Sequence, residues 1–425
     1  MTPSNRINPS VRVVITGIGT INPLGRSVPE YWANLAIGKN GVRRVQRTPL
    51  PENFPVKVGG EVDLPEDMTP YLPKKMMRRL DRFVHLGMVA ATEAFHDSHL
   101  DAEAIAKAPH RYGAIIGTGD AGVGFTYETF KTIETKGMDH TSPFYVVGVI
   151  PNTLSGFFAK ERGLQGPNFS INSACATSNH SLGTAASFIR TGLADVIFAG
   201  GSEAVVNTAG FAGFNAIFAL SRRSVDPETA SRPFDKDRDG FVLGEGAGVL
   251  CLEELGHAKA RGARIYGELT GFGMSCDAHD LVAPHPEGRG SALAMRFALE
   301  DARLAPEAIG LINAHGTSTP IGDLAECIGI HQAFGAAAAS IPVHSTKSMT
   351  GHLIGAAGGI EAIACLQALN ESLVHPTIHL HEKDPRIDLD IVSPGAREIS
   401  VDHVLSNSFG FGGHNACIVL SKFKD

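Results

Sequence analysis

The stretch that decides the fold reads Asn168-Phe-Ser-Ile-Asn-Ser-Ala-Cys175-Ala-Thr-Ser-Asn-His180. It predicts a strand that enters a sharp turn of small residues, followed by a helix over 176–190. Cys175 then lies at a helix N-terminus, where unpaired N–H groups and the helix dipole favour a thiolate. A thiolate at the end of a strand is a good acyl acceptor. The alternative is a buried cysteine that acts as a small hydrophobic residue.

Outward from this stretch, β-branched runs alternate with helical patterns, which predicts an α/β protein with buried, mostly parallel sheets. The expected strands are 11–16, 112–117, 196–201, 247–252, 264–271, 309–314, 341–346, 402–407 and 416–421. The expected helices are 73–95, 176–190, 291–302, 324–334 and 355–369. We place a boundary between two halves after Gly262, at the end of a basic helical stretch.

Composition narrows the class of protein. The 425 residues are 43% hydrophobic and 19% charged, and the net charge of −7 gives no overall basic character for nucleic acid. The six cysteines are scattered without a C-x-x-C pair, which favours reduced thiols in a cytoplasm over disulfides or a metal site. Residues 1–9 lack the apolar segment of a secretory signal, and the run 353–369 is too polar for a membrane span.

Two further strand ends carry histidines. His315 follows the strand Ile309–Ala314, and His352 follows the segment Ile341-Pro-Val-His-Ser-Thr-Lys347-Ser-Met-Thr-Gly. Active sites of α/β proteins lie at the carboxyl ends of strands, so the two imidazoles and the Cys175 thiol form one candidate site. A fourth strand end, Asn407-Ser-Phe-Gly-Phe-Gly-Gly413, has glycines that let backbone N–H groups point into a cavity, as an oxyanion hole requires.

These motifs, in this order, resemble the β-ketoacyl-[acyl-carrier-protein] synthases, and most closely the synthase II branch. The segment Ser231-Arg-Pro-Phe-Asp-Lys-Asp-Arg-Asp-Gly-Phe-Val-Leu-Gly-Glu-Gly-Ala-Gly248 also fits, so the resemblance covers almost the whole chain. It implies a thiolase-like fold of five alternating αβαβα layers, built from two similar halves, 11–262 and 263–425. It also implies a homodimer, an acyl carrier protein as partner, and no cofactor beyond the phosphopantetheine of that carrier.

The resemblance assigns roles to named residues. Cys175 accepts the acyl chain, while His315 and His352 stabilise the enolate that forms when malonyl-carrier protein loses CO2. Lys347 is expected to pair with Glu326, either to orient the site or as a plain structural ion pair. The remaining assignments are Phe411, Gly412 and Phe409 at the oxyanion hole and gate, Thr317 and Thr319 at phosphopantetheine, and Asp323 in the network behind the histidines.

The carrier is expected on the basic face of the helix 73–95, formed by Lys74, Lys75, Arg78, Arg79 and Arg82; a merely solvated face is the alternative.

Several positions depart from the family pattern. Asp120 replaces an apolar residue at the far end of the acyl tunnel, where it either makes the tunnel polar or turns aside to cap the loop 119–122. Phe218 replaces an arginine that contacts the carrier. His414 and the loop 277–282 also differ. These departures leave two alternatives open: a specialised polyketide or aryl-polyene synthase with a paired subunit, and a catalytically idle acyl-binding partner.

Overall fold

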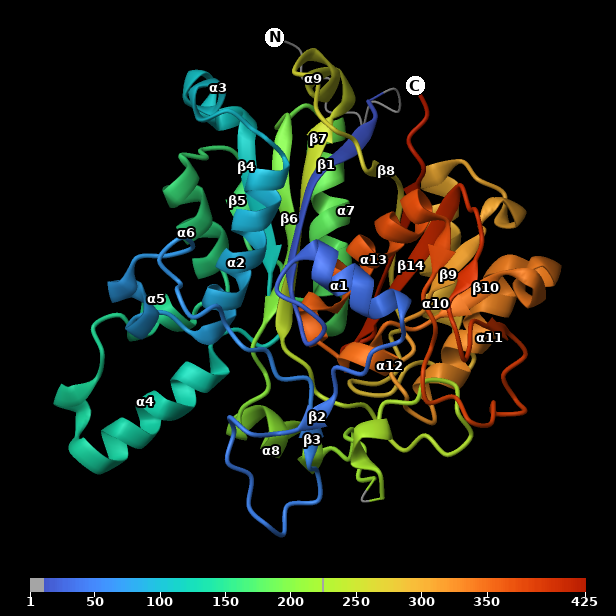
Figure 1. Cartoon of the computed structure of the whole chain (residues 1–425), viewed down its shortest axis with the longest axis horizontal. Coiled ribbons are helices and arrows are strands. Elements are labelled where there is room, and N and C mark those ends of the chain that lie inside the picture. Colours follow the sequence, from blue (N-terminus) through green and yellow to red (C-terminus); the bar gives the residue numbers. More distant parts are fainter. Residues whose placement is uncertain (1–10, 224) are drawn as a thin grey trace.

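The computed structural model describes residues 11–223 and 225–425. An 11-stranded sheet runs through the described chain in the order β12-β10-β9-β14-β15-β8-β1-β7-β6-β4-β5 (Figure 1). Its strands are β1 (Val13–Ile21), β4 (Tyr112–Gly117), β5 (Asn168–Phe169), β6 (Val196–Glu203), β7 (Gly246–Glu254), β8 (Gly267–Cys276), β9 (Leu311–Asn313), β10 (Pro342–His344), β12 (Asp390–Ile391), β14 (His403–Gly410) and β15 (His414–Ser421). The expectation for residues 1–9 lies outside the described residues.

The sheet consists of two parts with the same strand order. The first part reads β5-β4-β6-β7-β1 and the second reads β10-β9-β14-β15-β8, with β12 added outside β10. In each part the chain visits the positions in the same sequence, so the two parts are topological copies. The seam is a short antiparallel pairing of β1 with β8, through Val14 with Glu268 and Ile15 with Gly267. The predicted boundary after Gly262 lies just before β8 and stays a prediction.

The prediction of mostly parallel sheets is wrong. Parallel pairing is confined to the two outer parts, β12-β10-β9-β14 and β6-β4-β5. The five pairings between β14 and β6 are antiparallel. The reason is that β7 and β15 return antiparallel beside the strands that precede them, β6 and β14, and the two halves meet edge to edge through β1 and β8.

Helices complete five layers. The central layer holds α7 (Thr177–Arg190) and α13 (Ala357–Glu371), which lie between the two parts of the sheet in Figure 1 and contact strands of both. On one outer face, α2 (Arg82–Asp97) covers β1, β6 and β7. On the other outer face, α10 (Arg289–Ala302) covers β8 and β15 and packs against α11 (Gly322–Phe334). Twelve of the fifteen residues of α13 are buried, which fits a helix covered on all sides.

The predicted helix 73–95 is wrong at its start. Residues Lys74–Arg78 form a separate 3₁₀ turn, and α2 begins only at Arg82. Asp81 causes the break, because its carboxylate accepts the N–H of Phe83 and caps α2. The other predicted strands and helices are present with shifted ends.

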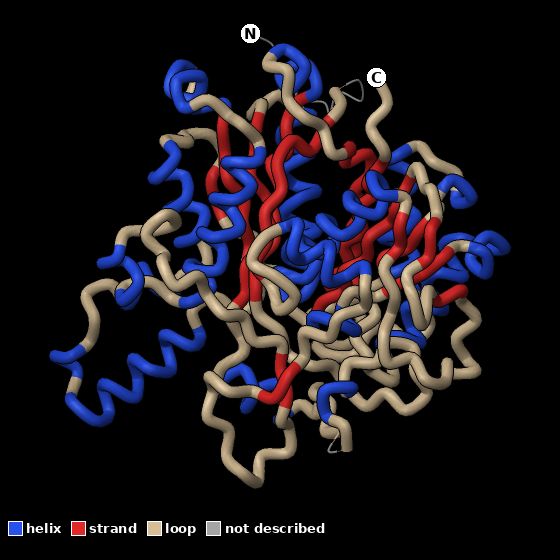
Figure 2. The backbone as a smooth tube through the Cα atoms, viewed as in Figure 1, coloured by secondary structure: helices blue, strands red, loops and turns tan. Residues whose placement is uncertain are grey.

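Loops and short elements, which Figure 2 shows in tan and as short coloured segments, lie at both ends of the sheets. They include α1 (Val28–Ala36), β2 (Arg43–Arg44), β3 (Val58–Gly59), α3 (Ala102–Lys107), α4 (Val123–Lys136), α5 (Tyr145–Val149), α6 (Thr153–Arg162), α8 (Thr208–Ala216), α9 (Leu255–Ala260), α12 (Lys347–Thr350), β11 (Leu373–Val374) and β13 (Arg397–Glu398). Among them, α3 and α9 lie at one end of the sheets, and β2, β3 and α8 lie at the other (Figure 1). Across residues 11–223 and 225–425, every helix is too short or too polar to cross a membrane.

Candidate active site

Cys175 lies in a tight elbow between β5 and α7. The elbow is the 3₁₀ turn η4 (Ala174–Ala176), and Ala174 has a φ of +49° in the left-handed region. Such strain is maintained where the surroundings require it, and here it turns the thiol toward the interior of the molecule. The Cys175 residue is 5% exposed.

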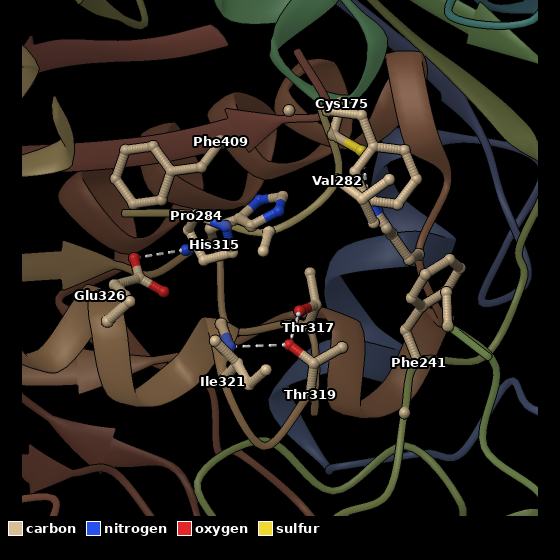
Figure 3. Close-up of a pocket in the computed structure, with 18 of the residues that line it drawn as sticks. Cys175, Phe241, Val282, Pro284, His315, Thr317, Thr319, Ile321, Glu326 and Phe409 are labelled. Carbon is tan, nitrogen blue, oxygen red and sulfur yellow. Dashed lines mark hydrogen bonds between the residues drawn. The ribbon is translucent and has the colours of Figure 1, made fainter. Parts of the chain in front are cut away.

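Two imidazoles meet this thiol. The His352 Nε2 atom lies 3.0 Å from Cys175 Sγ, and one ligand atom each of Cys175, His315 and His352 all lie within 4.8 Å of one another. The two rings are nearly perpendicular, with centroids 5.3 Å apart. His315 follows β9, as the sequence predicted (Figure 3), whereas the helix α12 separates His352 from the end of β10. Three groups far apart in the chain therefore converge on one point.

Both histidines are neutral. Burial lowers the pKa of His315 well below the usual value, and the Lys347 ammonium and His352 lower it further. Burial and Lys347 likewise lower the pKa of His352. A neutral imidazole has one N–H donor and one acceptor nitrogen, so each ring can donate a hydrogen bond without adding charge to the site.

The expected thiolate at Cys175 is contradicted. Burial raises the pKa of the Cys175 thiol to about 12, although Lys347 and the backbone N–H groups of Phe411 and Cys175 act in the opposite direction. The loss of hydration therefore raises the pKa of Cys175 by more than the helix N-terminus lowers it. A protonated thiol needs a proton acceptor when it attacks, and His352 Nε2 is within reach.

The glycine-rich hairpin between β14 and β15 closes over the elbow. A Cβ on Gly410 would lie 3.0 Å from the Cys175 nitrogen, so this approach requires glycine. The N–H groups of Phe411 and Cys175 both hydrogen-bond toward Sγ, as an oxyanion hole at this point requires. Phe409 packs edge-on against the His315 ring, and Gly412, at φ +82°, donates its N–H to the Leu281 carbonyl.

The predicted pairing of Lys347 with Glu326 is wrong. Lys347 Nζ donates instead to Glu361 Oε1 on α13 at 2.5 Å, and both side chains are 1% exposed. Sequence reasoning did not assign Glu361, although a single charge within an otherwise apolar helix is a signal for a buried ion pair. Glu326 accepts the N–H groups of His315 and Gly316, each at 2.8 Å (Figure 3). Glu326 therefore fixes the backbone that carries His315.

The loop after His315 contributes two hydroxyls to the cavity. Thr317 and Thr319 line it, and their Oγ1 atoms lie 3.1 Å apart. Asp323, by contrast, does not contact the histidines. Its carboxylate accepts the N–H of Ser318 and faces Arg238 at 3.4 Å, behind the loop. The expectation for Asp323 is corrected accordingly: it positions the threonine loop from behind.

Asp120 does not line this cavity. The loop around it is held by Glu203, at the end of β6, which accepts the N–H groups of Gly119 at 2.7 Å and Asp120 at 3.2 Å. The capping expected of Asp120 is thus performed by a residue that sequence reasoning missed. Burial raises the pKa of Asp120, and burial together with Asp120 raises the pKa of Glu203 to about 8.

The predicted basic face divides into two groups. Lys74, Lys75 and Arg78 are exposed on the 3₁₀ turn, and Arg79 stacks over the Phe144 ring at 4.1 Å. Arg82 is different, because it forms an ion pair with the fully buried Glu245 at 2.7 Å, which Arg47 also contacts. Arg82 is a structural residue, and its expected place in a carrier-binding face is corrected.

The reacting groups lie at the inner end of a cavity of about 390 Å³. Its lining includes Cys175, His315, His352, Phe409 and Phe411, together with Thr317, Thr319 and the exposed Phe218 and Val282. A cavity of this kind, mostly apolar with a few convergent polar groups, suits a long flexible substrate arm whose reactive end reaches the thiol.

Comparison with known proteins identifies relatives of this arrangement. The β-ketoacyl synthase N-terminal domain matches residues 10–258, and the β-ketoacyl synthase C-terminal domain matches residues 266–381. A 3-oxoacyl-[acyl-carrier-protein] synthase 2 of Synechocystis is 45% identical, with 97% of this chain and 98% of that protein covered. The corresponding synthase 2 of Vibrio harveyi is 43% identical over 97% of this chain and 99% of that protein.

Solved structures agree. A type II polyketide synthase acyl-carrier protein in complex with its ketosynthase matches with a TM-score of 0.90 and 32% identity, over 97% of this chain and 100% of that chain. A β-ketoacyl synthase from Burkholderia phymatum matches with a TM-score of 0.89 and 34% identity, over the same shares. The predicted five-layered fold of two similar halves is confirmed, and the chain belongs to the β-ketoacyl synthase family.

Proposed function

We propose that this protein catalyses a decarboxylative Claisen condensation. An acyl chain held on Cys175 reacts with malonyl-[acyl-carrier protein] to give 3-oxoacyl-[acyl-carrier protein] and CO2. The observation that carries the proposal is the convergence of one thiol and two neutral imidazoles within 4.8 Å at the inner end of a cavity. Relatives of 43–45% identity over nearly the whole chain are 3-oxoacyl-[acyl-carrier-protein] synthases.

Acyl transfer comes first. The Cys175 sulfur attacks the thioester carbonyl of the acyl-carrier protein, and its proton passes to His352 Nε2 at 3.0 Å. The N–H groups of Cys175 and Phe411 stabilise the tetrahedral oxyanion. The intermediate collapses to acyl-Cys175, and the departing pantetheine thiolate takes a proton from His352. His352 is neutral again, and in the tautomer with its remaining proton on Nε2 it acts as a donor in the next step.

Condensation follows when malonyl-carrier protein enters. The bond to the carboxylate breaks, CO2 leaves, and the electron pair becomes an enolate whose oxygen accepts hydrogen bonds from the N–H groups of His315 and His352. The enolate carbon attacks the acyl-Cys175 carbonyl and expels the Cys175 thiolate, which is then protonated. Burial, and after it the Lys347 ammonium group of the Lys347–Glu361 pair, lowers the pKa of both histidines and favours their neutral forms.

Mass spectrometry tests the covalent step. Incubation with acyl-carrier protein should add one acyl group to the intact chain, and peptide mapping should place it on Cys175. The variant Cys276→Ser is the matched control, since Cys276 is exposed and would be the first target of non-specific chemistry. Absence of any acyl adduct would favour the idle acyl-binding partner, and an adduct at Cys276 would contradict the proposed nucleophile.

The pathway we propose is elongation in fatty acid synthesis. The identity to synthase 2 relatives, 43–45%, exceeds the 32–34% to the polyketide ketosynthase structures, which supports this choice. The second candidate is a specialised ketosynthase with a paired subunit, because a ketosynthase with its chain-length factor also matches with a TM-score of 0.90. Turnover with saturated and polyunsaturated acyl-carrier proteins of equal length separates the two.

We further propose a homodimer. Helix α4 projects from the body at the lower left of Figure 1, and its Tyr127 and Phe130 are 42% and 55% exposed. Val146 and Val147 on α5, which contacts α4, are 65% and 51% exposed, and β5 is an edge strand of the 11-stranded sheet. Exposed apolar side chains and an open sheet edge are both typical of an interface. Sedimentation should give twice the chain mass for the wild type and a smaller species for Phe130→Asp.

A cytoplasmic location and independence from any metal or redox cofactor belong to the same proposal. All six cysteines are free thiols, and the condensation as written balances without an electron acceptor.

A further inference from the structure

The mouth of the catalytic cavity is bordered by exposed apolar side chains. Phe218 is 74% exposed, Ile321 is 59%, Val282 is 45% and Ile217 is 43%, and all four also line the cavity. Leu281, next to Val282, is 80% exposed. We name these five residues the apolar rim. They come from three separate parts of the chain, so the rim is assembled by the fold and is not one accidental apolar segment.

A substrate that enters the catalytic cavity must pass the apolar rim. Cys175 is 5% exposed and lies at the inner end, while the rim residues lie at the outer end of the same cavity. An acyl group tethered to a carrier protein by a flexible arm must pass between them, so the body of the carrier comes to rest against the rim. This step rests on the function proposed above.

A charged side chain, that of Arg222, contacts Phe218 of the rim. The guanidinium of Arg222 lies over the Phe218 ring, 4.7 Å from its centroid, and donates to the Asn215 side-chain oxygen at 3.0 Å. Its planar face covers one side of the aromatic ring, as in a cation–π contact. Arg222 thereby rigidifies Phe218 and leaves the ring exposed, which is the arrangement of a preorganised anchor.

We propose that the carrier protein docks on the apolar rim by apolar contacts, with Phe218 and Leu281 as the anchors. The partner it fits is an acyl carrier protein with an apolar side chain close to its pantetheine attachment point. Affinity then comes mainly from buried apolar surface, which salt does not screen. Docking on the exposed lysines and arginine of the 3₁₀ turn 74–78 would instead weaken steeply with salt.

The test compares two substrates on the full-length protein. The probes, each added to protein already acylated on Cys175, are a malonyl-loaded bacterial acyl carrier protein and malonyl-pantetheine, which has the same reactive end without the protein body. The ratio of their KM values isolates the contribution of the carrier. Leu281→Ser should raise this ratio about tenfold, the effect of one lost interface anchor. The matched control is Leu193→Ser, which removes a 53% exposed leucine that does not line the cavity and should leave the ratio unchanged.

Phe218→Arg makes the test decisive. If docking is apolar, the KM ratio of this variant should be higher than that of the wild type. The KM ratio of the wild type should also stay almost constant between low and high salt. A lower ratio for Phe218→Arg, with a new salt dependence, would overturn the proposal, as would an unchanged ratio for both rim variants. If wild-type protein condenses neither probe, the proposed function fails; if it condenses both and the ratios do not respond, only the docking proposal fails.

Discussion

The two halves contain the same elbow and use it differently. In the first half, Ala174 at φ +49° precedes Cys175, and the 3₁₀ turn leads into α7. In the second half, Ile354 at φ +44° precedes Gly355, and the 3₁₀ turn η8 (Ile354–Ala356) leads into α13. The strand order around both is the same, so Gly355 is the topological counterpart of Cys175.

The difference lies in what fills each elbow. The N–H of Gly355 donates to the Glu203 carboxyl group at 3.0 Å, and a Cβ at Gly355 would lie 2.3 Å from the Gly119 nitrogen. The second elbow is thus closed by an acidic side chain and a glycine loop of the other half. In the first elbow the corresponding N–H faces Sγ and the cavity. In the second elbow the turn N–H donates to a carboxyl oxygen, and in the first elbow the equivalent N–H can donate to an oxygen in the cavity, which is the property an oxyanion hole needs.

The largest expected effect comes from making the first elbow chemically inert. Cys175→Ala should abolish acyl-enzyme formation and lower condensation by a factor on the order of 10⁴ or more, as the loss of a nucleophile does in other covalent enzymes. The measurement is 3-oxoacyl-carrier formation beside intact-mass analysis. Retention of an acyl adduct together with condensation would show that the thiol in the first elbow is not the acceptor.

The next prediction separates the two imidazoles that serve the first elbow. Only His352 is placed within hydrogen-bond distance of Sγ. Both variants, His315→Ala and His352→Ala, should lower malonyl decarboxylation by about 10²–10³-fold, the usual result of deleting one oxyanion donor. Acyl-Cys175 formation should survive in His315→Ala and slow in His352→Ala. Equal acylation rates in the two variants would contradict the assignment of the proton acceptor.

A smaller effect is expected from a side chain in the second elbow. Gly355→Ala introduces a Cβ that must displace the Gly119 backbone, and such overpacking costs about 1–3 kcal/mol of stability. Denaturant unfolding measures it. Gly395→Ala is the matched control, since the space around the Gly395 Cβ position is open among the described residues. A Gly355→Ala variant as stable as this control would show that the second elbow is not tightly closed.

The smallest effect concerns pH at the second elbow. The pKa of Glu203 rises from 4.5 to about 8 on folding, so folding favours its protonated form. This contribution to stability is fully present below pH 4.5 and is lost as pH rises through about 8. Asp120→Asn removes a negative charge that raises the pKa of Glu203, and should reduce the loss between pH 5 and pH 9 by about 1.4 kcal/mol for each unit by which that pKa falls. Parallel pH profiles for the two proteins would contradict this coupling.

Sequence reasoning identified the groups at strand ends, because a cysteine, two histidines and a glycine loop each follow a recognisable strand. It did not give the partner of Lys347. Glu326 is on α11, before Lys347, and Glu361 is on α13, after it, and only packing brings Glu361 to the ammonium. It also missed the break before α2, although Asp81 followed by an apolar run is an N-cap signal. The thiolate expectation was wrong since a helix terminus can be read from sequence, whereas the burial that opposes it cannot.

The placement of α7 has a consequence for synthesis on the ribosome. A Cβ at Gly183 of α7 would lie 2.2 Å from the Phe272 ring of β8. In the folded protein, this face of the helix therefore packs against the second half. The first half is translated before β8 exists, and until then that face has no cover. The nascent chain must hold a nearly complete sheet with its central helix open to water. Chaperone dependence and aggregation during expression should therefore respond to the translation rate across residues 263–276. They should respond less to the translation rate of other segments of either half.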